Sequence, residues 1–491
     1  MQYVSTRGNE EKATSAAVII RGLAPDRGLY VPEKIPSLPC SLQELIGKPY
    51  DYVAKKIISE FLTDFTDEEI TECTSKAYDE KFDTALIAPV VKTDKAYFLE
   101  LWHGQTAAFK DMALSILPWL LKTAAKKEGE DKKIAILTAT SGDTGKAALA
   151  GFADVPGTEV FVFYPKHGVS VVQERQMLTQ TGNNVHIYGI LGNFDEAQTG
   201  VKNVFNDTSL AEELAEAGIR LSSANSINIG RLVPQIAYYV YAYVKMLESG
   251  EIKDGEKINI CVPTGNFGNI LSAWYAKQMG LPVAKLICAS NENKVLSDFL
   301  NTGINDKRRE FILTSSPSMD ILVSSNLERL LWHLSNGESE TIKKLMTSFE
   351  ENGFYEADEE MKKALCDFYG GFAGMPVSHA ALAKLWHDEK YLIDTHTAVA
   401  YAVYLEYKEK TGDETKTLIT STANPYKFAS SVAEAIGTTM GTDEFETIEN
   451  LRKETGVNVP DSLSGLDTKP VLHDNVIDKD EIRDAVSESL L

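Results

Sequence analysis

Lys110 is the residue whose type and surroundings suggest covalent chemistry most directly. It follows Phe109 in the run HGQTAAFKD (103–111) and precedes the apolar stretch 113–117. We expect that element to be largely buried, and burial disfavours the ammonium form of a lysine. A neutral lysine amine attacks aldehydes and forms a Schiff base. The other interpretation is a lysine whose stem lies on apolar surface while its charge pairs with Asp111.

Two further runs have the character of anion-binding turns, because each places glycines between an expected strand and an expected helix. The first, VPTGNFGN (262–269), lets the backbone approach a phosphate and direct several N–H groups at it. The second, TATSGDTGK (138–146), combines short hydroxyls with a helix N-terminus and suits a carboxylate or phosphate. It is not a Walker loop, since only two residues separate Gly142 from Gly145. Ordinary turns, with asparagines in left-handed conformations or hydroxyls as helix caps, remain the alternative.

A Schiff-base lysine and a phosphate-binding turn are two of the parts that pyridoxal phosphate requires, because its aldehyde and its phosphate lie on opposite sides of one ring. The third part is a partner for the ring nitrogen. In the run LITSTANP (418–425), neutral hydroxyls follow a late expected strand. A hydroxyl suits an unprotonated ring nitrogen better than a pyridinium. A polar exit from a strand into a loop is the alternative for this run.

The elements that must position these residues alternate between short apolar runs and helix-like segments. Helical periodicity is expected near 50–65 and over 270–279. Alternation of strand and helix predicts parallel sheets covered on both faces, with ligands at the carboxyl ends of the strands. The runs expected as buried strands are 97–101, 134–138, 160–164, 185–188, 258–262 and 286–289.

The amino-acid composition argues against several classes of binding partner. The 491 residues include 49 Lys and Arg against 71 Asp and Glu, which gives a formal charge of −22. Such a chain is a poor general surface for nucleic acid or anionic lipid. It has neither a signal-like start nor an uncharged apolar run of membrane-spanning length, and its five scattered cysteines suggest no disulfide framework or zinc site. We therefore expect a cytoplasmic protein that binds neither nucleic acid nor membrane and holds no metal.

Five motifs in a fixed order resemble those of the threonine synthases, pyridoxal-phosphate enzymes of the fold-type-II (tryptophan-synthase β-like) group. They are H-G-x-T-x-A-F-K-D, T-S-G-D-T-G, S-A-N-S-I-N-x-x-R, P-T-G-N-F-G-N and S-T-A-x-P-x-K-F. The resemblance, which extends to Phe428, implies two α/β domains with mainly parallel sheets around a cofactor cleft, plus an N-terminal extension. The implied boundaries are an N-terminal segment 1–93, a large cofactor-binding domain 94–132 and 235–491, and a smaller domain 133–234.

The resemblance also implies roles for single residues. Lys110 would form the internal aldimine and shuttle protons, Thr422 would face the ring nitrogen, and Asp143 lies where the wider group often has Asn near the ring hydroxyl. The residues that would hold the cofactor phosphate are Gly265, Asn266, Phe267, Gly268 and Asn269. Those that would bind substrate are Thr140, Ser141, Thr144, Asn225, Ser226 and Arg231. Gln105 and Asn424 depart from the family pattern, which frequently has Pro and His there.

The reaction that the resemblance implies converts O-phospho-L-homoserine and water to L-threonine and phosphate, by γ-elimination and addition of water at the β-carbon. A doubly anionic substrate needs a positive cleft in this acidic chain, and Arg231, Lys146 and helix N-termini are expected to supply it. A related lyase or dehydratase that releases 2-oxobutyrate is the main alternative, although dehydratases have no phosphate leaving group to bind. A catalytically idle binding homologue is another. The protein would be a monomer or homodimer.

Other polar and aromatic residues are expected to be structural. We expect His103 to hold its turn, and the motif DTHTAV (394–399) looks familial without an assigned chemistry. Three further histidines lack the spacing of metal ligands and should belong to surface or core helices, and four tyrosines at helical spacing should be buried packing. These residues are His379, His387 and His396, and Tyr238, Tyr239, Tyr241 and Tyr243.

Overall fold

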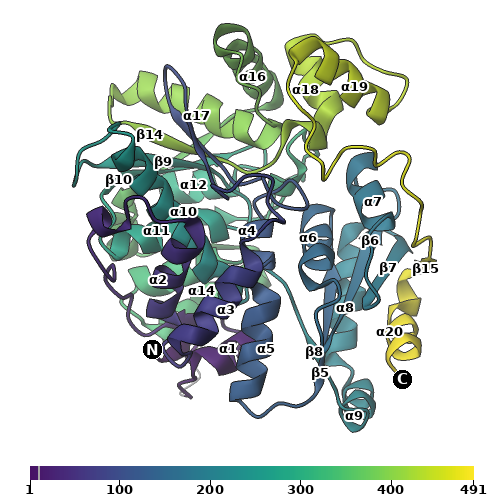
Figure 1. The fold of residues 1–491 in the computed structure, drawn as a ribbon. Coiled ribbons are helices and arrows are strands. Elements are labelled where there is room, and N and C mark those ends of the chain that lie inside the picture. The colour runs from purple at the N-terminus through teal and green to yellow at the C-terminus, as the bar shows by residue number, and fades with distance from the viewer. Residues whose placement is uncertain (9–10) are drawn as a thin grey trace.

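Two sheets with their flanking helices form the framework of the protein (Figure 1). This computed structural model describes residues 1–8 and 11–491. The larger sheet has six strands in the order β13-β10-β9-β14-β4-β3, parallel except for β3, which runs antiparallel to β4. Its strands are β3 (Val90–Lys92), β4 (Tyr97–Glu100), β9 (Ile258–Pro263), β10 (Val283–Ser290), β13 (Phe368–Phe372) and β14 (Thr417–Ser421).

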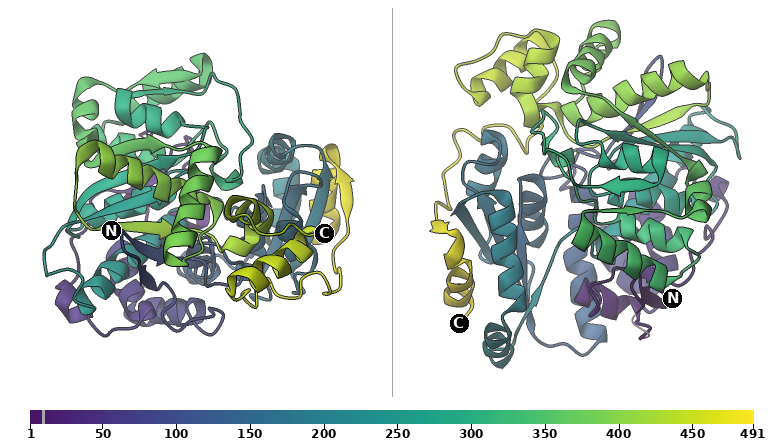
Figure 2. Two further views of the ribbon diagram at one scale, coloured as in Figure 1. Left: turned by 90° about the horizontal axis from the view of Figure 1, so that it is seen from above. Right: turned by 180° about the vertical axis from the view of Figure 1, so that it is seen from behind.

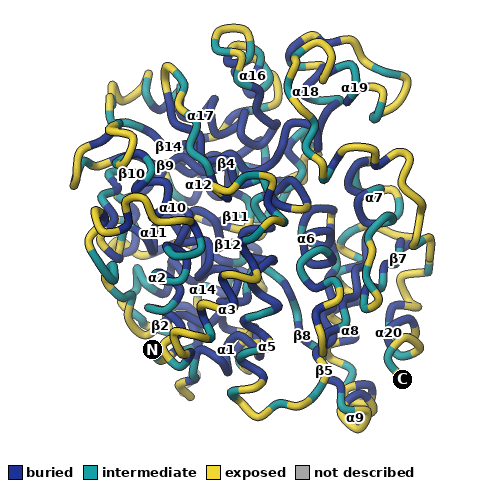
Figure 3. The backbone as a smooth tube through the Cα atoms, viewed as in Figure 1, coloured by how far each residue is buried: buried dark blue, intermediate teal, exposed yellow. Residues whose placement is uncertain are grey.

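The smaller sheet has five parallel strands in the order β15-β7-β6-β5-β8. They are β5 (Lys133–Ala139), β6 (Thr158–Pro165), β7 (Val185–Leu191), β8 (Ile219–Ser222) and β15 (Val476–Asp478). All six apolar runs expected as strands coincide with β4, β5, β6, β7, β9 and β10, so these predictions are confirmed. They were detectable because parallel strands are covered on both faces; every residue of β9 is buried, and β9, β4 and β14 lie among the dark blue, buried parts of the tube in Figure 3.

Helices cover opposite faces of the smaller sheet. Ile134 and Ile136 of β5 pack in the same apolar cluster as α6, whereas their neighbours Ala135 and Leu137 pack in the cluster of α8. This alternation follows from the two-residue period of a strand. The helices around this sheet are α6 (Asp143–Phe152), α7 (Val171–Leu178), α8 (Phe194–Asn206), α9 (Thr208–Glu216) and α20 (Ile482–Leu490). Figure 2 shows this part of the protein beside the larger one.

The larger sheet carries most of the remaining helices. Those before β9 are α1 (Ser15–Arg21), α2 (Tyr50–Phe61), α3 (Asp67–Ala77), α4 (Asp111–Leu114), α5 (Leu117–Lys127) and α10 (Ile229–Glu248). Those after β9 are α11 (Gly268–Gln278), α12 (Val295–Thr302), α13 (Leu327–Leu334), α14 (Ser339–Asn352), α15 (Glu359–Ala364), α16 (Met375–Glu389), α17 (Thr395–Thr411), α18 (Ala429–Ile436) and α19 (Glu444–Thr455). In the described part of the chain, none of the helices has the length and apolar character needed to traverse a bilayer.

The N-terminal segment packs on the larger part of the fold. Helix α2 contacts α10, and α1 contacts α5. The small sheet of β1 (Tyr3–Ser5) and β2 (Tyr30–Pro32) is tied to the same body by the fully buried Arg329, whose Nε donates to the carbonyl oxygen of Tyr30 at 2.9 Å. The four tyrosines of α10 are buried, which confirms their interpretation as packing residues.

The structure departs from the expected domain boundaries at three places. We expected all of 235–491 in the larger domain, but β15 pairs with β7 and α20 packs on α8 of the smaller one. The chain crosses between them through 456–475, which has no apolar period that a sequence could reveal. At the other boundary, β3 falls inside the expected N-terminal segment 1–93 yet pairs with β4 in the larger sheet. Helix α10 likewise begins at Ile229, before the expected boundary at 234.

The contribution of the returning C-terminal helix can be measured with Ile482→Ala. Ile482 is 1% exposed and belongs to the apolar cluster between α20 and the smaller sheet. Its truncation should lower the free energy of unfolding by about 2–4 kcal/mol, the usual effect of a buried aliphatic-to-alanine change. Urea denaturation would measure it, with the exposed Glu488→Ala on the same helix as control. Equal stability of the two variants would contradict this packing.

Candidate active site

Lys110 lies where the larger sheet faces the smaller one, just before α4 and after the carboxyl end of β4. Its side chain is 12% exposed, and its Nζ lies 3.3 Å from Oδ2 of Asp143. Burial lowers the pKa of Lys110, against the opposing effect of Asp143. The alternative partner, Asp111, is engaged elsewhere: it accepts hydrogen bonds from the backbone N–H and the hydroxyl of Thr106 at 2.8 and 2.7 Å. The amine of Lys110 is therefore paired with Asp143 and not with its neighbour Asp111.

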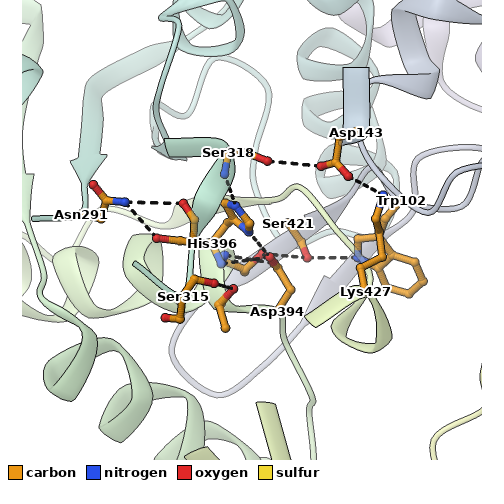
Figure 4. A network of polar contacts seen from close by, with 12 residues as sticks. Trp102, Asp143, Asn291, Ser315, Ser318, Asp394, His396, Ser421 and Lys427 are labelled. Atoms are coloured by element: carbon orange, nitrogen blue, oxygen red, sulfur yellow. Dashed lines mark hydrogen bonds and ion pairs between the residues drawn. The ribbon is translucent and has the colours of Figure 1, made fainter. Parts of the chain in front are cut away.

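Asp143, the first residue of α6, is the centre of a buried polar cluster (Figure 4). Its Oδ1 lies 2.6 Å from Nζ of Lys427 and accepts from Nε2 of Gln173 at 2.9 Å. Burial alone would raise the pKa of this carboxyl, but Lys427 and Lys110 hold it well below its usual range. Sequence reasoning missed Lys427, which is fully buried and also donates to the carbonyl oxygen of Thr106 at 2.9 Å. Its place in the motif S-T-A-x-P-x-K-F was the one available signal.

The glycine-rich turn after β9 presents uncapped N–H groups. Phe267 precedes α11 with a left-handed φ of 63°, and no side chain caps the first turn of that helix. The first N–H groups of a helix have no acceptor within it, so they remain available to an anion. The residue with the left-handed conformation is Phe267 and not an asparagine. The alternative of an ordinary turn with a left-handed asparagine therefore does not describe this turn. A Cβ at Gly265 would lie 2.8 Å from the carbonyl oxygen of Ser318, so glycine is required there.

Asn269, beside this turn, has a polar atom without a partner among the described residues. Asn269 accepts hydrogen bonds from the hydroxyls of Tyr238 and Tyr239 through Oδ1, whereas its buried Nδ2 has no partner among the described residues. At the end of β14, the hydroxyl of Ser421 is engaged by Nε1 of Trp102 at 3.1 Å. The neighbouring Thr422 is 6% exposed, and its carbonyl oxygen accepts from Phe109 N–H at 2.8 Å, which places it beside Lys110.

These observations fit pyridoxal phosphate. A buried amine with a lowered pKa suits its aldehyde, and the uncapped N-terminus of α11 with the orphaned amide of Asn269 suits its phosphate. Thr422 lies near enough to Lys110 to meet the ring. Asn424, where the family often has His, caps the following turn by accepting from Tyr426 N–H at 3.0 Å. The other departure, Gln105, is exposed.

The residues expected to bind substrate fall into two groups. Thr140 shapes its own turn, because its hydroxyl oxygen accepts from the N–H groups of Gly142 and Gly145 at 3.0 and 2.9 Å. Ser141 is exposed and Thr144 is partly exposed, so both hydroxyls can reach a ligand. Asn225 and Ser226 are partly exposed in the segment that leads into α10.

Arg231 points an unused donor into this region. Its guanidinium donates to the carbonyl oxygen of Ala224 at 2.9 Å, but its buried Nε has no partner within the described chain. Burial lowers the pKa of Arg231 to about 10, and the charge of Arg231 helps to lower the pKa of Lys110. The expectation of a local positive cluster in an acidic chain agrees with the positions of Lys110, Arg231, Lys427 and Lys146, which are all buried or nearly so.

The histidines have structural partners. Although burial opposes it, Asp83 and Glu100 raise the pKa of His103 to about 9, and the ring stacks on Trp102. His396 was expected to be an ordinary helical histidine, yet it forms a buried pair with Asp394. That pair is missing from the sequence interpretation, because the motif around it suggested no partner.

The pair of Asp143 and Lys427 predicts a compensating double variant. Asp143→Asn should destabilise the fold, because it leaves the charge of Lys427 buried without its carboxylate. Breaking a buried pair in this way typically costs about 3–5 kcal/mol. Adding Lys427→Met removes the stranded charge and should recover a large part of the loss. Urea denaturation compares the variants, and a double variant no more stable than Asp143→Asn would contradict the pairing.

Lys146 predicts a pH dependence of stability. Burial lowers the pKa of Lys146 to about 7, whereas an unfolded lysine titrates near 10.4. Between these two pKa values the unfolded chain binds a proton that the folded chain lacks. The contribution of Lys146 therefore raises the free energy of unfolding as pH rises and lowers it as pH falls towards 7. The advantage of Lys146→Met over the parent should therefore shrink by up to about 3 kcal/mol from pH 7 to pH 9.5. A constant difference in unfolding free energy would contradict this.

Comparisons with known proteins identify the family. Three family models match: "Threonine synthase N terminus" over 2–78, "Pyridoxal-phosphate dependent enzyme" over 87–423, and "Threonine synthase, C-terminal" over 397–486. The threonine synthase of Schizosaccharomyces pombe is 34% identical over 89% of each chain. "Threonine synthase-like 1" of Homo sapiens is 38% identical over 88% of this chain, which spans 60% of that protein's length.

Solved structures extend the likeness to three dimensions. The pyridoxal-phosphate-bound threonine synthase of Brucella melitensis superimposes with a TM-score of 0.88 at 32% identity, covering 100% of this chain and 98% of the other. Sequence and fold thus agree, and the chain belongs to the threonine synthase family of pyridoxal-phosphate-dependent enzymes.

Proposed function

We propose that this protein is a threonine synthase, which converts O-phospho-L-homoserine and water to L-threonine and phosphate. The observation that carries the proposal is the buried Nε of Arg231, which has no partner within the described chain and whose charge acts on Lys110. A reactive amine beside an arginine with a buried, unused donor suits an amino acid that carries a phosphate, because a guanidinium matches phosphate oxygens.

The cofactor, when bound, withdraws electrons from the carbon chain of an attached amino acid and so acidifies protons on its α- and β-carbons. Lys110 would hold the cofactor and, once released by substrate, its amine would move the proton at the α-carbon. A lowered pKa favours this, since a base must be unprotonated to accept a proton. Gly265, Asn266, Phe267, Gly268 and Asn269 would bind the cofactor phosphate, Thr422 would meet the ring nitrogen, and Asp143 would lie near the ring hydroxyl.

The remaining residues would orient the substrate. Ser141 and Thr144 would bind its carboxylate, with Thr140 holding their turn in shape. Asn225, Ser226 and Arg231 would hold its phosphate, which leaves from the γ-carbon while the hydroxyl arrives at the β-carbon. If Arg231 retained that phosphate, the phosphate would occupy the anion site and exclude competing anions until water has added.

A phospho-lyase that releases 2-oxobutyrate is the second candidate. The residues proposed to bind the phosphate would serve it equally well. The two activities differ in whether water is delivered to the β-carbon before the product departs. Only the product distinguishes them.

We also propose a cytoplasmic location and a monomeric or homodimeric state. All five cysteines are free, which accords with a reducing compartment. Neither nucleic acid nor membrane is proposed as a partner, because the formal charge of −22 disfavours both kinds of anionic surface.

The decisive experiment incubates the purified protein and pyridoxal phosphate with O-phospho-L-homoserine. L-threonine and phosphate should appear in equal amounts, measured by amino-acid chromatography and a phosphate assay. Lys110→Ala should abolish turnover while its circular dichroism spectrum stays unchanged. Release of 2-oxobutyrate in place of threonine would favour the phospho-lyase, absence of any product would favour a binding homologue, and normal turnover by Lys110→Ala would refute the assigned role of the lysine.

A further inference from the structure

Ser318 connects a surface segment to the centre of the site. It lies between β11 (Ile304–Asp306) and α13, and its hydroxyl donates to Oδ2 of Asp143 at 3.2 Å. The same carboxylate oxygen lies 3.3 Å from Nζ of Lys110. The carbonyl oxygen of Ser318 backs Gly265, where an added Cβ would approach it to 2.8 Å. One residue thus touches both Asp143 and the turn proposed to hold the cofactor phosphate.

The backbone of Ser318 is held by His396. Its N–H donates to Nε2 of His396 at 3.1 Å, and Nδ1 of the ring lies 2.7 Å from Oδ2 of Asp394 (Figure 4). Because Nε2 accepts a hydrogen bond, the ring proton must be on Nδ1, where the carboxylate receives it. Asp394 is fully buried and His396 is 3% exposed, so water cannot replace either bond without opening the core.

Asp394 also connects this contact to the end of β14, the strand that leads to Thr422. It caps α17, and its Oδ1 accepts from Thr397 N–H at 3.0 Å. The hydroxyl of Thr397 reaches that of Ser421 at 3.3 Å, the residue before Thr422. A single buried carboxylate therefore sets the end of β14 and, through His396, the position of Ser318.

The segment around Ser318 is held mainly by polar contacts. Phe311, Ile312 and Leu313, just before it, are exposed, whereas Met319 is 3% exposed and packs in an apolar cluster. The N–H of Ser318 itself is held by His396. A cap for α17 requires only Asp394, since an aspartate satisfies a helix N-terminus by itself. The imidazole is therefore not explained by capping; its second nitrogen is used on the backbone of Ser318.

We propose that His396 is a positioning residue, which acts through Ser318 to fix Asp143 and the phosphate turn and so determines how tightly the protein holds its cofactor. The role rests on the cofactor of the family and, for any effect on turnover, on the proposed function. Loss of the Nε2 acceptor leaves the Ser318 N–H unpaired, lets the segment move away from Gly265, and removes the hydroxyl that orients Asp143 toward Lys110.

Two substitutions separate the two nitrogens of the ring. Gln carries an amide oxygen as far out as Nε2, so His396→Gln can still accept from Ser318 N–H. Asn ends one bond earlier: His396→Asn can donate to Asp394 but cannot reach Ser318. The matched control is His379→Asn, because His379 contacts the hydroxyl of Ser315 in the same segment at 3.1 Å without touching Asp143 or Gly265.

The readout is the dissociation constant of pyridoxal phosphate, titrated on each full-length variant by the absorbance of bound cofactor. His396→Asn should weaken binding about tenfold, as the loss of one buried hydrogen bond does. His396→Gln should stay within about threefold of the parent, and His379→Asn should match it. Hydrogen exchange over 314–320 should be faster in His396→Asn alone. Parent-like affinity in His396→Asn, or equal losses in the Asn and Gln variants, would overturn the proposal.

Ser318→Ala tests the same connection if either histidine variant folds poorly. It keeps the backbone N–H and removes only the hydroxyl, and it should weaken cofactor binding several-fold without changing the melting temperature; an unchanged dissociation constant would overturn the proposal. Because no substrate enters the titration, its outcome is the same whether the protein releases threonine or 2-oxobutyrate. Failure of this proposal and failure of the proposed function are thus distinguishable.

Discussion

The carboxylate of Asp143, buried between the amines of Lys110 and Lys427, is the interaction on which the site depends. Asp143 comes from α6 of the smaller sheet, whereas the two lysines follow β4 and β14 of the larger one. These three residues therefore join the two halves of the protein where the carboxyl ends of their strands meet. Burying any one of these three charged groups alone would be strongly unfavourable. The attraction between the carboxylate and the two amines offsets their loss of hydration.

The same geometry explains how an acidic protein can attract anions. The formal charge of −22 lies mostly on exposed side chains, whereas Arg231 and Lys427 are buried and both act electrostatically on Lys110. Their charges act through protein rather than water, so they are screened less than the surface acids. The uncapped start of α11 adds partial positive charge of the same sign. Local arrangement, and not net charge, thus determines what the cleft can bind.

Much of the framework was predictable from sequence, because parallel strands leave continuous apolar runs and the turns after them leave glycines. Lys110 could be expected to be buried from its apolar neighbours alone. The partners of Asp143 could not: the motif that contains Lys427 gave it no partner, and Ser318 lies 175 positions away in the chain. His396 lacked metal spacing, and its function depends on one backbone N–H that no pattern encodes. The return of β15 was hidden for the same reason, since edge strands of three residues have little signal.

The late crossing at 456–475 has a mechanical consequence. The chain also passes between the halves at 128–132 and 223–228, and the late crossing is pinned to α7 by Arg175, which donates to the carbonyl oxygens of Leu466, Asp467 and Lys469. A body tethered at well-separated places can rock about an axis through its tethers but cannot slide freely. The C-terminal strap therefore restrains movement of the two halves relative to each other.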